Sequence, residues 1–71
     1  MRVEINGESR ELPEGLSLND LIRELSLAPE RIAVELNHEV VRRQEWPLTM
    51  IANDDRIELV HFVGGGSEVR P

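Results

Sequence analysis

The stretch from Ser17 to Leu25, SLNDLIREL, is the most informative part of this 71-residue sequence about its fold. Leucine and isoleucine recur there at spacings of three and four, which places one apolar stripe along an α-helix. The stripe consists of Leu18, Leu21, Ile22 and Leu25. A helix with a single apolar face has to bury that face, so we expect it to lie on a sheet.

The ends of this helix also have sequence signals. Ser17 is the expected N-cap, and Asp20 takes the place of the acidic member of a capping box three residues later. Leu16 and Leu21 stand at the two positions of a hydrophobic staple. Pro29 is expected to end the helix.

Apolar and polar residues alternate on both sides of the helix, which predicts strands. Asn6-Gly7 is a strong signal for a tight hairpin, because both residues tolerate positive φ. The remaining turns fall at Asn37-His38 and at Asn53-Asp54-Asp55. The expected strands are residues 2–6, 8–12, 32–36, 40–41 and 56–63.

The order strand, strand, helix, strand, short strand, strand predicts an α+β protein with the β-grasp (ubiquitin-like) fold. We expect a mixed four- to five-stranded sheet with one main helix packed on one face, and the first and last strands paired at the centre. A ferredoxin-like fold requires a second long helix, and residues 43–52 lack a second apolar stripe. Trp46-Pro47 is expected to anchor a short helical turn there instead.

The composition excludes several classes of function. The net charge is −6, with eight arginines and no lysine, which argues against a nucleic-acid partner and suits a basic protein surface. There is no cysteine, and His38 and His61 lack neighbouring metal ligands, so no metal site is predicted. No nucleophile and base can be paired, and His61 is interpreted as an ordinary strand residue. We therefore expect a protein that is not an enzyme and binds no cofactor.

The location is predicted from two features of the sequence. The chain opens Met1-Arg2-Val3-Glu4-Ile5, with charges inside its first apolar stretch, which is unlike a signal peptide. No apolar run approaches the ~20 residues that span a bilayer. We expect a cytoplasmic protein with no membrane partner.

The last predicted strand leads into Gly64, Gly65 and Gly66, and the tail Ser67–Pro71 follows. A triple glycine makes an arm without side chains that can enter a narrow channel, which suits a C-terminus that is itself the reacting group. The same composition is typical of a flexible linker. The predicted organisation is a β-grasp domain at 1–63, a flexible glycine arm at 64–66 and an appended tail at 67–71.

The last strand offers a candidate docking face. If Ile57 and Leu59 pack under the helix, then Glu58, Val60 and Phe62 point to the uncovered side of the sheet. An exposed Val60 and Phe62 beside the arm predict a partner-binding patch. Alternatively, Phe62 folds over the sheet edge and fills a gap in a small core.

Two segments carry a resemblance to a known family. Residues 55–66, DRIELVHFVGGG, resemble the C-terminus of the thiamine-biosynthesis sulfur carrier protein (ThiS) family. Residues 36–46, LNHEVVRRQEW, are similar to the middle segment of the same family. The matching residues there are Asn37, Val41, Arg43 and Trp46. The small subunit of molybdopterin synthase is the alternative carrier, but its usual proline-rich approach to the glycines is absent.

The resemblance covers residues 1–66, and it implies a chemical role for the three glycines. Gly66 is the position of the reacting carboxylate in the family, with Gly65 and Gly64 before it. A ubiquitin-activating-type adenylyltransferase that uses ATP and Mg would activate this carboxylate. A sulfur donor protein would convert it to a thiocarboxylate, and thiazole synthase would take the sulfur.

The sequence departs from the family at Ser67–Pro71, because the family ends at the glycines. An amide at Gly66 has no free carboxylate to adenylate. The tail is explained by vector-derived residues, by removal in the cell, or by the start of a natural fusion. Two other classes stay open: a ubiquitin-like binding module that uses Val60 and Phe62, and an engineered scaffold with a glycine-rich end.

Overall fold

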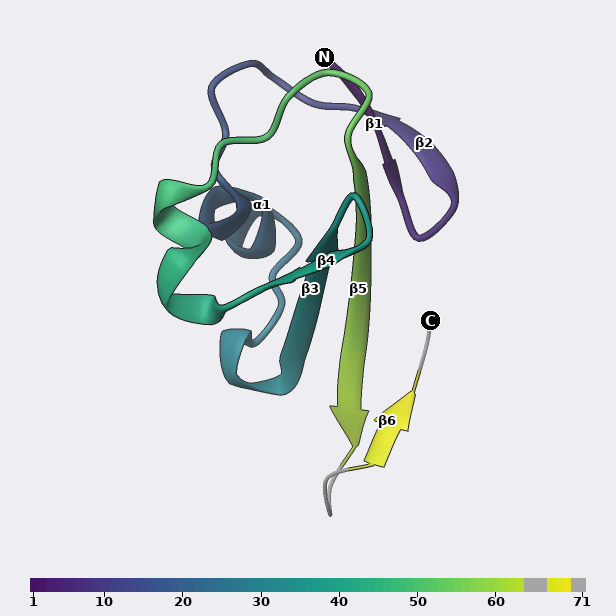
Figure 1. Cartoon of the computed structure of the whole chain (residues 1–71), viewed down its shortest axis with the longest axis vertical. Coiled ribbons are helices and arrows are strands. Elements are labelled where there is room, and N and C mark those ends of the chain that lie inside the picture. Colours follow the sequence, from purple (N-terminus) through teal and green to yellow (C-terminus); the bar gives the residue numbers. More distant parts are fainter. Residues whose placement is uncertain (64–66, 70–71) are drawn as a thin grey trace.

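The computed structural model of the protein describes residues 1–63 and 67–69. One α-helix and two short 3-10 helices lie on one side of a sheet (Figure 1). In chain order the elements are β1 (Arg2–Ile5), β2 (Glu8–Glu11), α1 (Leu18–Glu24), the 3-10 helix η1 (Pro29–Arg31), β3 (Ile32–Leu36), β4 (Glu39–Val41), the 3-10 helix η2 (Arg43–Leu48), β5 (Arg56–Val63) and β6 (Ser67–Val69).

The two central strands of the sheet come from opposite ends of the domain. β1 runs parallel to β5, with Glu4 opposite Arg56 and Ile5 opposite Ile57. β2 flanks β1, while β3 and then β4 follow on the far side of β5, which gives the order β2-β1-β5-β3-β4. α1 supplies the crossover that a parallel arrangement requires. The predicted β-grasp fold and its mixed sheet are confirmed.

The start of α1 is closed by the predicted capping box. The Ser17 side chain accepts a hydrogen bond from the Asp20 N–H at 3.1 Å. In return, Asp20 Oδ2 accepts one from the Ser17 N–H at 3.0 Å. Two donors at the helix terminus are thereby satisfied, which fixes where the chain enters the helix.

The end of α1 differs from the prediction. The helix ends at Glu24, before Pro29, because Ser26 adopts a left-handed conformation with φ of 57°. The Ser26 N–H then bonds to the Arg23 carbonyl, and the Leu27 N–H bonds to the Ile22 carbonyl. This pair of bonds is a Schellman motif, which terminates a helix without proline. Pro29 begins η1 instead.

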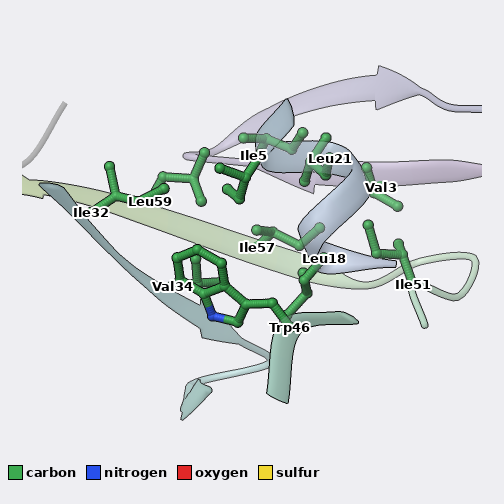
Figure 2. Close-up of a cluster of buried hydrophobic side chains, with 11 residues drawn as sticks. Val3, Ile5, Leu18, Leu21, Ile32, Val34, Trp46, Ile51, Ile57 and Leu59 are labelled. Carbon is green, nitrogen blue, oxygen red and sulfur yellow. The ribbon is translucent and has the colours of Figure 1, made fainter. Parts of the chain in front are cut away.

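One hydrophobic core lies between α1 and the sheet (Figure 2). Alternate residues of β1, β3 and β5 supply its floor, and the helix supplies its roof. η2 closes the side, because the Trp46 ring is 1% exposed and packs into this core. The Trp46 Nε1–H also donates to the Val41 carbonyl at 2.9 Å, which satisfies the polar edge of the ring. The predicted helical turn at Trp46-Pro47 is confirmed.

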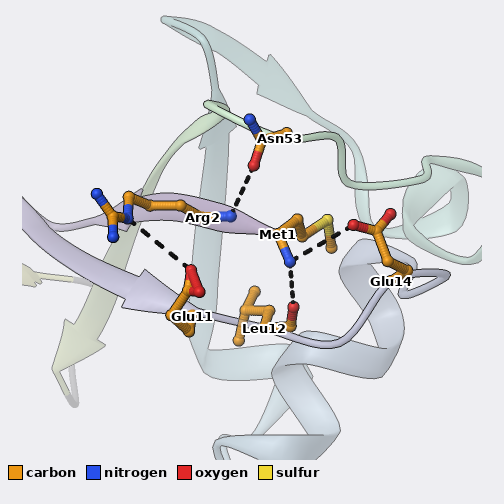
Figure 3. Close-up of polar contacts among 6 residues, drawn as sticks. All are labelled: Met1, Arg2, Glu11, Leu12, Glu14 and Asn53. Carbon is orange, nitrogen blue, oxygen red and sulfur yellow. Dashed lines mark hydrogen bonds and ion pairs between the residues drawn. The ribbon is translucent and has the colours of Figure 1, made fainter.

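Polar contacts hold the start of β1 in place (Figure 3). The Met1 amino group donates to the Leu12 carbonyl at 2.7 Å and lies 3.5 Å from Glu14 Oε2. The Arg2 N–H donates to Asn53 Oδ1 at 2.8 Å. The start of β1 is therefore tied both to the segment before α1 and to the loop before β5.

We expect Trp46→Ala to lower the free energy of unfolding by about 3–5 kcal/mol, because it removes the largest buried side chain. Trp46→Phe keeps much of the ring but removes the Nε1–H donor, so its loss should be smaller. Urea unfolding measures both values. An Ala variant as stable as the Phe variant would show that packing of the ring contributes little.

We expect Asp20→Asn to destabilise the protein in a pH-dependent way. Hydrogen bonds from the Ser17 backbone and then its side chain hold the pKa of the Asp20 carboxyl below its usual value of 3.8. Because the folded-state pKa is the lower one, the stabilisation is complete above the usual value and is lost as pH falls through the folded-state pKa. Thermal unfolding should show a difference in Tm at neutral pH that closes in acid. A constant difference would contradict the capping role of the charge.

Candidate functional site

β5 connects the centre of the sheet to the glycines (Figure 1). Its pairing with β3 ends where His61 lies opposite Ile32, so Phe62 and Val63 extend past that neighbour. The predicted reacting residues at positions 64–66 lie outside the described residues. Their expected role therefore stays a prediction, and the candidate site is built from the strand that leads to them.

The inner face of β5 belongs to the core. Ile57 and Leu59 are buried against α1, as the alternation predicts. His61 follows on the same face and is half-buried beside Leu59. Its interpretation as a strand residue of this face is confirmed.

On the outer face of β5, the expectation that Val60 is exposed is wrong. Val60 is only 4% exposed, so it is not part of an exposed apolar patch. It lies directly opposite Ala33 of β3, and cross-strand neighbours on one face of a sheet cover part of each other's side chains. Phe62 and Glu58 are half-buried on this face. The role of these three residues in partner binding stays a prediction.

Charges on the outer face are mainly acidic. Glu58 lies opposite Glu35 of β3, and Glu4 of β1 lies opposite Arg56. The Arg56 Nε is 3.9 Å from Glu4 Oε2, with both side chains largely in solvent, so the pair adds little stability. An acidic sheet face is complementary to a basic protein surface.

An open groove lies on the helix side of the sheet, beside Leu59 and His61 of β5. It runs between the β1–β2 turn, the segment after α1 and the end of β5. Leu25, Leu27 and Leu59 make it apolar, while Glu8 and Arg10 bring opposite charges to its rim. The groove is lined by Ile5, Asn6, Glu8, Arg10, Leu25, Leu27, Leu59 and His61.

Most residues that carry the middle-segment resemblance have structural roles. Asn37 adopts φ of 52° in the turn between β3 and β4. Its Oδ1 accepts from the Arg56 N–H at 2.9 Å, and its Nδ2 donates to Asp55 Oδ1 at 3.0 Å. The Asn37 side chain therefore joins this turn to the start of β5. Arg43 is exposed at the start of η2.

Sequence reasoning missed a strand in the tail. Ser67–Val69 forms β6, which pairs antiparallel with the last residues of β5. Val63 lies opposite Ser67, so three residues separate the paired ends. A glycine-containing connection of three to five residues between two strand-like runs is a hairpin signal. The resemblance to a glycine arm or a linker hides this hairpin signal in the sequence.

Within residues 1–63 and 67–69, no group of three or more histidine, aspartate or glutamate side chains is arranged to hold a metal ion. None of the helices in this part of the chain has both the length and the apolar character needed to cross a membrane.

Comparison with known sequences gives a family match that runs almost the full length of the domain. The model of the ThiS family matches residues 3–66. The chain is 42% identical over 66 residues to a thiazole synthase of Magnetococcus marinus, which covers 93% of this chain and 20% of that protein. The chain thus spans about a fifth of the length of this relative.

Smaller relatives match over most of their own length. The sulfur carrier protein ThiS of Bacillus subtilis is 34% identical over 50 residues, which cover 70% of this chain and 76% of that protein. The crystal structure of a thiamine biosynthesis protein (ThiS) from Geobacter metallireducens superimposes with a TM-score of 0.82 at 33% identity, covering 93% of this chain and all of that one. The family match from Val3 to Gly66 and the shared fold show that this chain belongs to the ThiS family.

Proposed function

We propose that this chain is a cytoplasmic sulfur carrier protein of thiamine biosynthesis and that it carries sulfur as a thiocarboxylate on Gly66. The observation that supports this most strongly is the extent of the family match, which ends at Gly66 and not at the end of the chain. Relatives named sulfur carrier protein ThiS add to it. The chain is a protein co-substrate, and the catalytic groups belong to its partners.

The chemistry follows from the nature of a carboxylate. Its negative charge repels nucleophiles, so it has to be activated before sulfur can replace oxygen. A carboxylate oxygen of Gly66 attacks the α-phosphorus of ATP, and Mg pyrophosphate leaves. Sulfide, supplied by a donor protein, then attacks the acyl carbon, and AMP departs with one of the former carboxylate oxygens, which leaves the thiocarboxylate on Gly66.

The adenylyltransferase, the sulfur donor protein and thiazole synthase are the partners of this proposal. The similarity to thiazole synthases from two organisms supports the last of them. The acidic outer face of the sheet, with Glu58 and Phe62 of β5, is the proposed docking surface for the adenylyltransferase. Glycine at positions 64–66 lets the arm enter a narrow active-site channel, because it carries no Cβ.

The tail at 67–71 prevents this chemistry for as long as it is attached. In the full chain Gly66 is joined to Ser67 by an amide bond, so it has no carboxylate. Hydrolysis of that bond by a protease adds one water, which leaves the carboxylate on Gly66 and the amine on Ser67. The proposed active form is therefore residues 1–66.

A chain of residues 1–66 should be adenylated by the adenylyltransferase of the same organism, whereas the 71-residue chain should not. Pyrophosphate release with ATP measures the first step. After addition of sulfide, intact mass should show the exchange of one oxygen for one sulfur in the short chain only. Sulfur uptake by the full chain without loss of its tail would contradict the role of the tail.

In the 1–66 chain, Gly66→Ala should slow adenylation by roughly tenfold or more, which corresponds to about 1.4 kcal/mol in the transition state. The added Cβ restricts φ and widens the arm inside the channel. The Tm should stay unchanged, because no residue of the hydrophobic core is altered. Equal adenylation rates for the two chains would show that the channel does not require glycine.

A further inference from the structure

The edge of β5 that faces β1 is covered by that strand only along its first half. The Asn6 N–H donates to the Ile57 carbonyl at 2.9 Å, and Asn6 Oδ1 accepts from the Leu59 N–H at 2.8 Å. Alternate residues of a strand direct their backbone groups to the same edge. The N–H and C=O groups of His61 and Val63 therefore also face this edge, beyond the reach of β1.

β1 leaves this edge because its chain turns back into β2. Asn6 and Gly7 have φ of 51° and 82°, the paired positive values of a tight hairpin turn. The Asn6 side chain satisfies the Leu59 N–H in place of a further residue of β1. The next two residues that face this edge need another source of hydrogen bonds.

β6 occupies the rest of the edge in the full chain (Figure 1). His61 pairs with Ile32 of β3 on one side and with Val69 of β6 on the other, so β6 lies on the edge shared with β1. Since the backbone groups of His61 face β6, His61 and Val69 form a hydrogen-bonded pair. The same applies to Val63 and Ser67.

We propose that the edge of β5 at His61–Val63 is a docking edge for one extended strand of the adenylyltransferase, and that β6 fills it until the tail is removed. This inference rests on the proposed function. Removal of residues 67–71 leaves the N–H and C=O groups of His61 and Val63 without their strand partner. An open edge of this kind accepts an extended segment by β-strand addition.

The place of the edge favours the enzyme that acts on Gly66 as the occupant. The edge ends at Val63, and only two residues separate it from the reacting glycine. A strand paired there fixes the direction in which the arm leaves the domain. The adjoining groove, with Leu25, Leu27 and Leu59, can receive side chains from one face of the added strand. Main-chain bonds would supply affinity, and the groove would supply specificity.

The tail would then inhibit the carrier in two separable ways. It caps the Gly66 carboxyl group as an amide, and it occupies the edge on which the enzyme docks. The second effect depends on strand pairing alone, so a substitution that breaks the pairing should remove it while the tail stays attached.

Two proline variants of the 71-residue chain test whether β6 fills the edge. Val69→Pro removes an N–H that faces β5, whereas Glu68→Pro removes one that faces away from it, because Glu68 alternates with the hydrogen-bonded positions. In Val69→Pro the amides of His61 and Val63 should exchange with solvent roughly tenfold faster or more. In Glu68→Pro they should exchange as in the native chain. Equal exchange in both variants would overturn the assignment of β6 as the strand that fills this edge.

Docking is tested with the 1–66 chain and the adenylyltransferase, by hydrogen exchange of the same two amides. Both amides should exchange freely in the 1–66 chain alone and become protected in the complex, as they are in the 71-residue chain. Adenylation of the 1–66 chain without such protection would overturn the docking edge and leave the proposed function intact. A 1–66 chain that neither binds nor is adenylated would overturn both.

Discussion

The parallel pairing of β1 with β5 is the contact on which the rest of the structure depends. It joins the two ends of the domain at the centre of the sheet, through bonds such as that from the Glu4 N–H to the Asp55 carbonyl. Parallel pairing is possible only because the chain crosses over through α1 between β2 and β3. The core is closed by the same arrangement, since residues of β1 and β5 form its floor beneath the helix. The glycines therefore follow a strand whose first half lies at the centre of the sheet.

The two halves of β5 have different surroundings. Ile57 and Leu59 hold the core, and their backbone groups bond to Asn6 on the β1 side of the strand. At His61 the strand passes the end of β1, and at Phe62 it passes the end of β3. Beyond this point the strand that pairs with β5 is β6. Changes there can alter binding with little effect on folding, because the core lies behind them.

The family resemblance reflects folding as much as chemistry. Asn37 binds the β3–β4 turn to the start of β5, and Trp46 seals the side of the core. Any chain with this arrangement of turns and helices needs one side chain that joins the turn to the strand and one that fills the side of the core. Similarity in the middle segment therefore argues for the fold, whereas the argument for sulfur transfer rests on the run that ends at Gly66. The two kinds of similarity have different physical origins and support different conclusions.

Features that depend only on neighbouring residues could be predicted from the sequence. The stripe at Leu18, Leu21 and Ile22, the capping box at Ser17 and the turn at Asn6-Gly7 follow local rules of period, hydrogen bonding and backbone conformation. The order of the elements was then enough to predict the sheet. The reacting glycines were proposed from the sequence as well, through their resemblance to the family.

Features that depend on residues distant in the sequence are visible only in the folded structure. Val60 is buried and has Ala33 of β3 as its cross-strand neighbour, which alternation along β5 cannot show. The length of β1 beside β5 determines how much of the edge stays open, and β6 fills that part by pairing across the glycines. Strand pairing is a contact between two segments, and the pattern within either segment does not specify its partner.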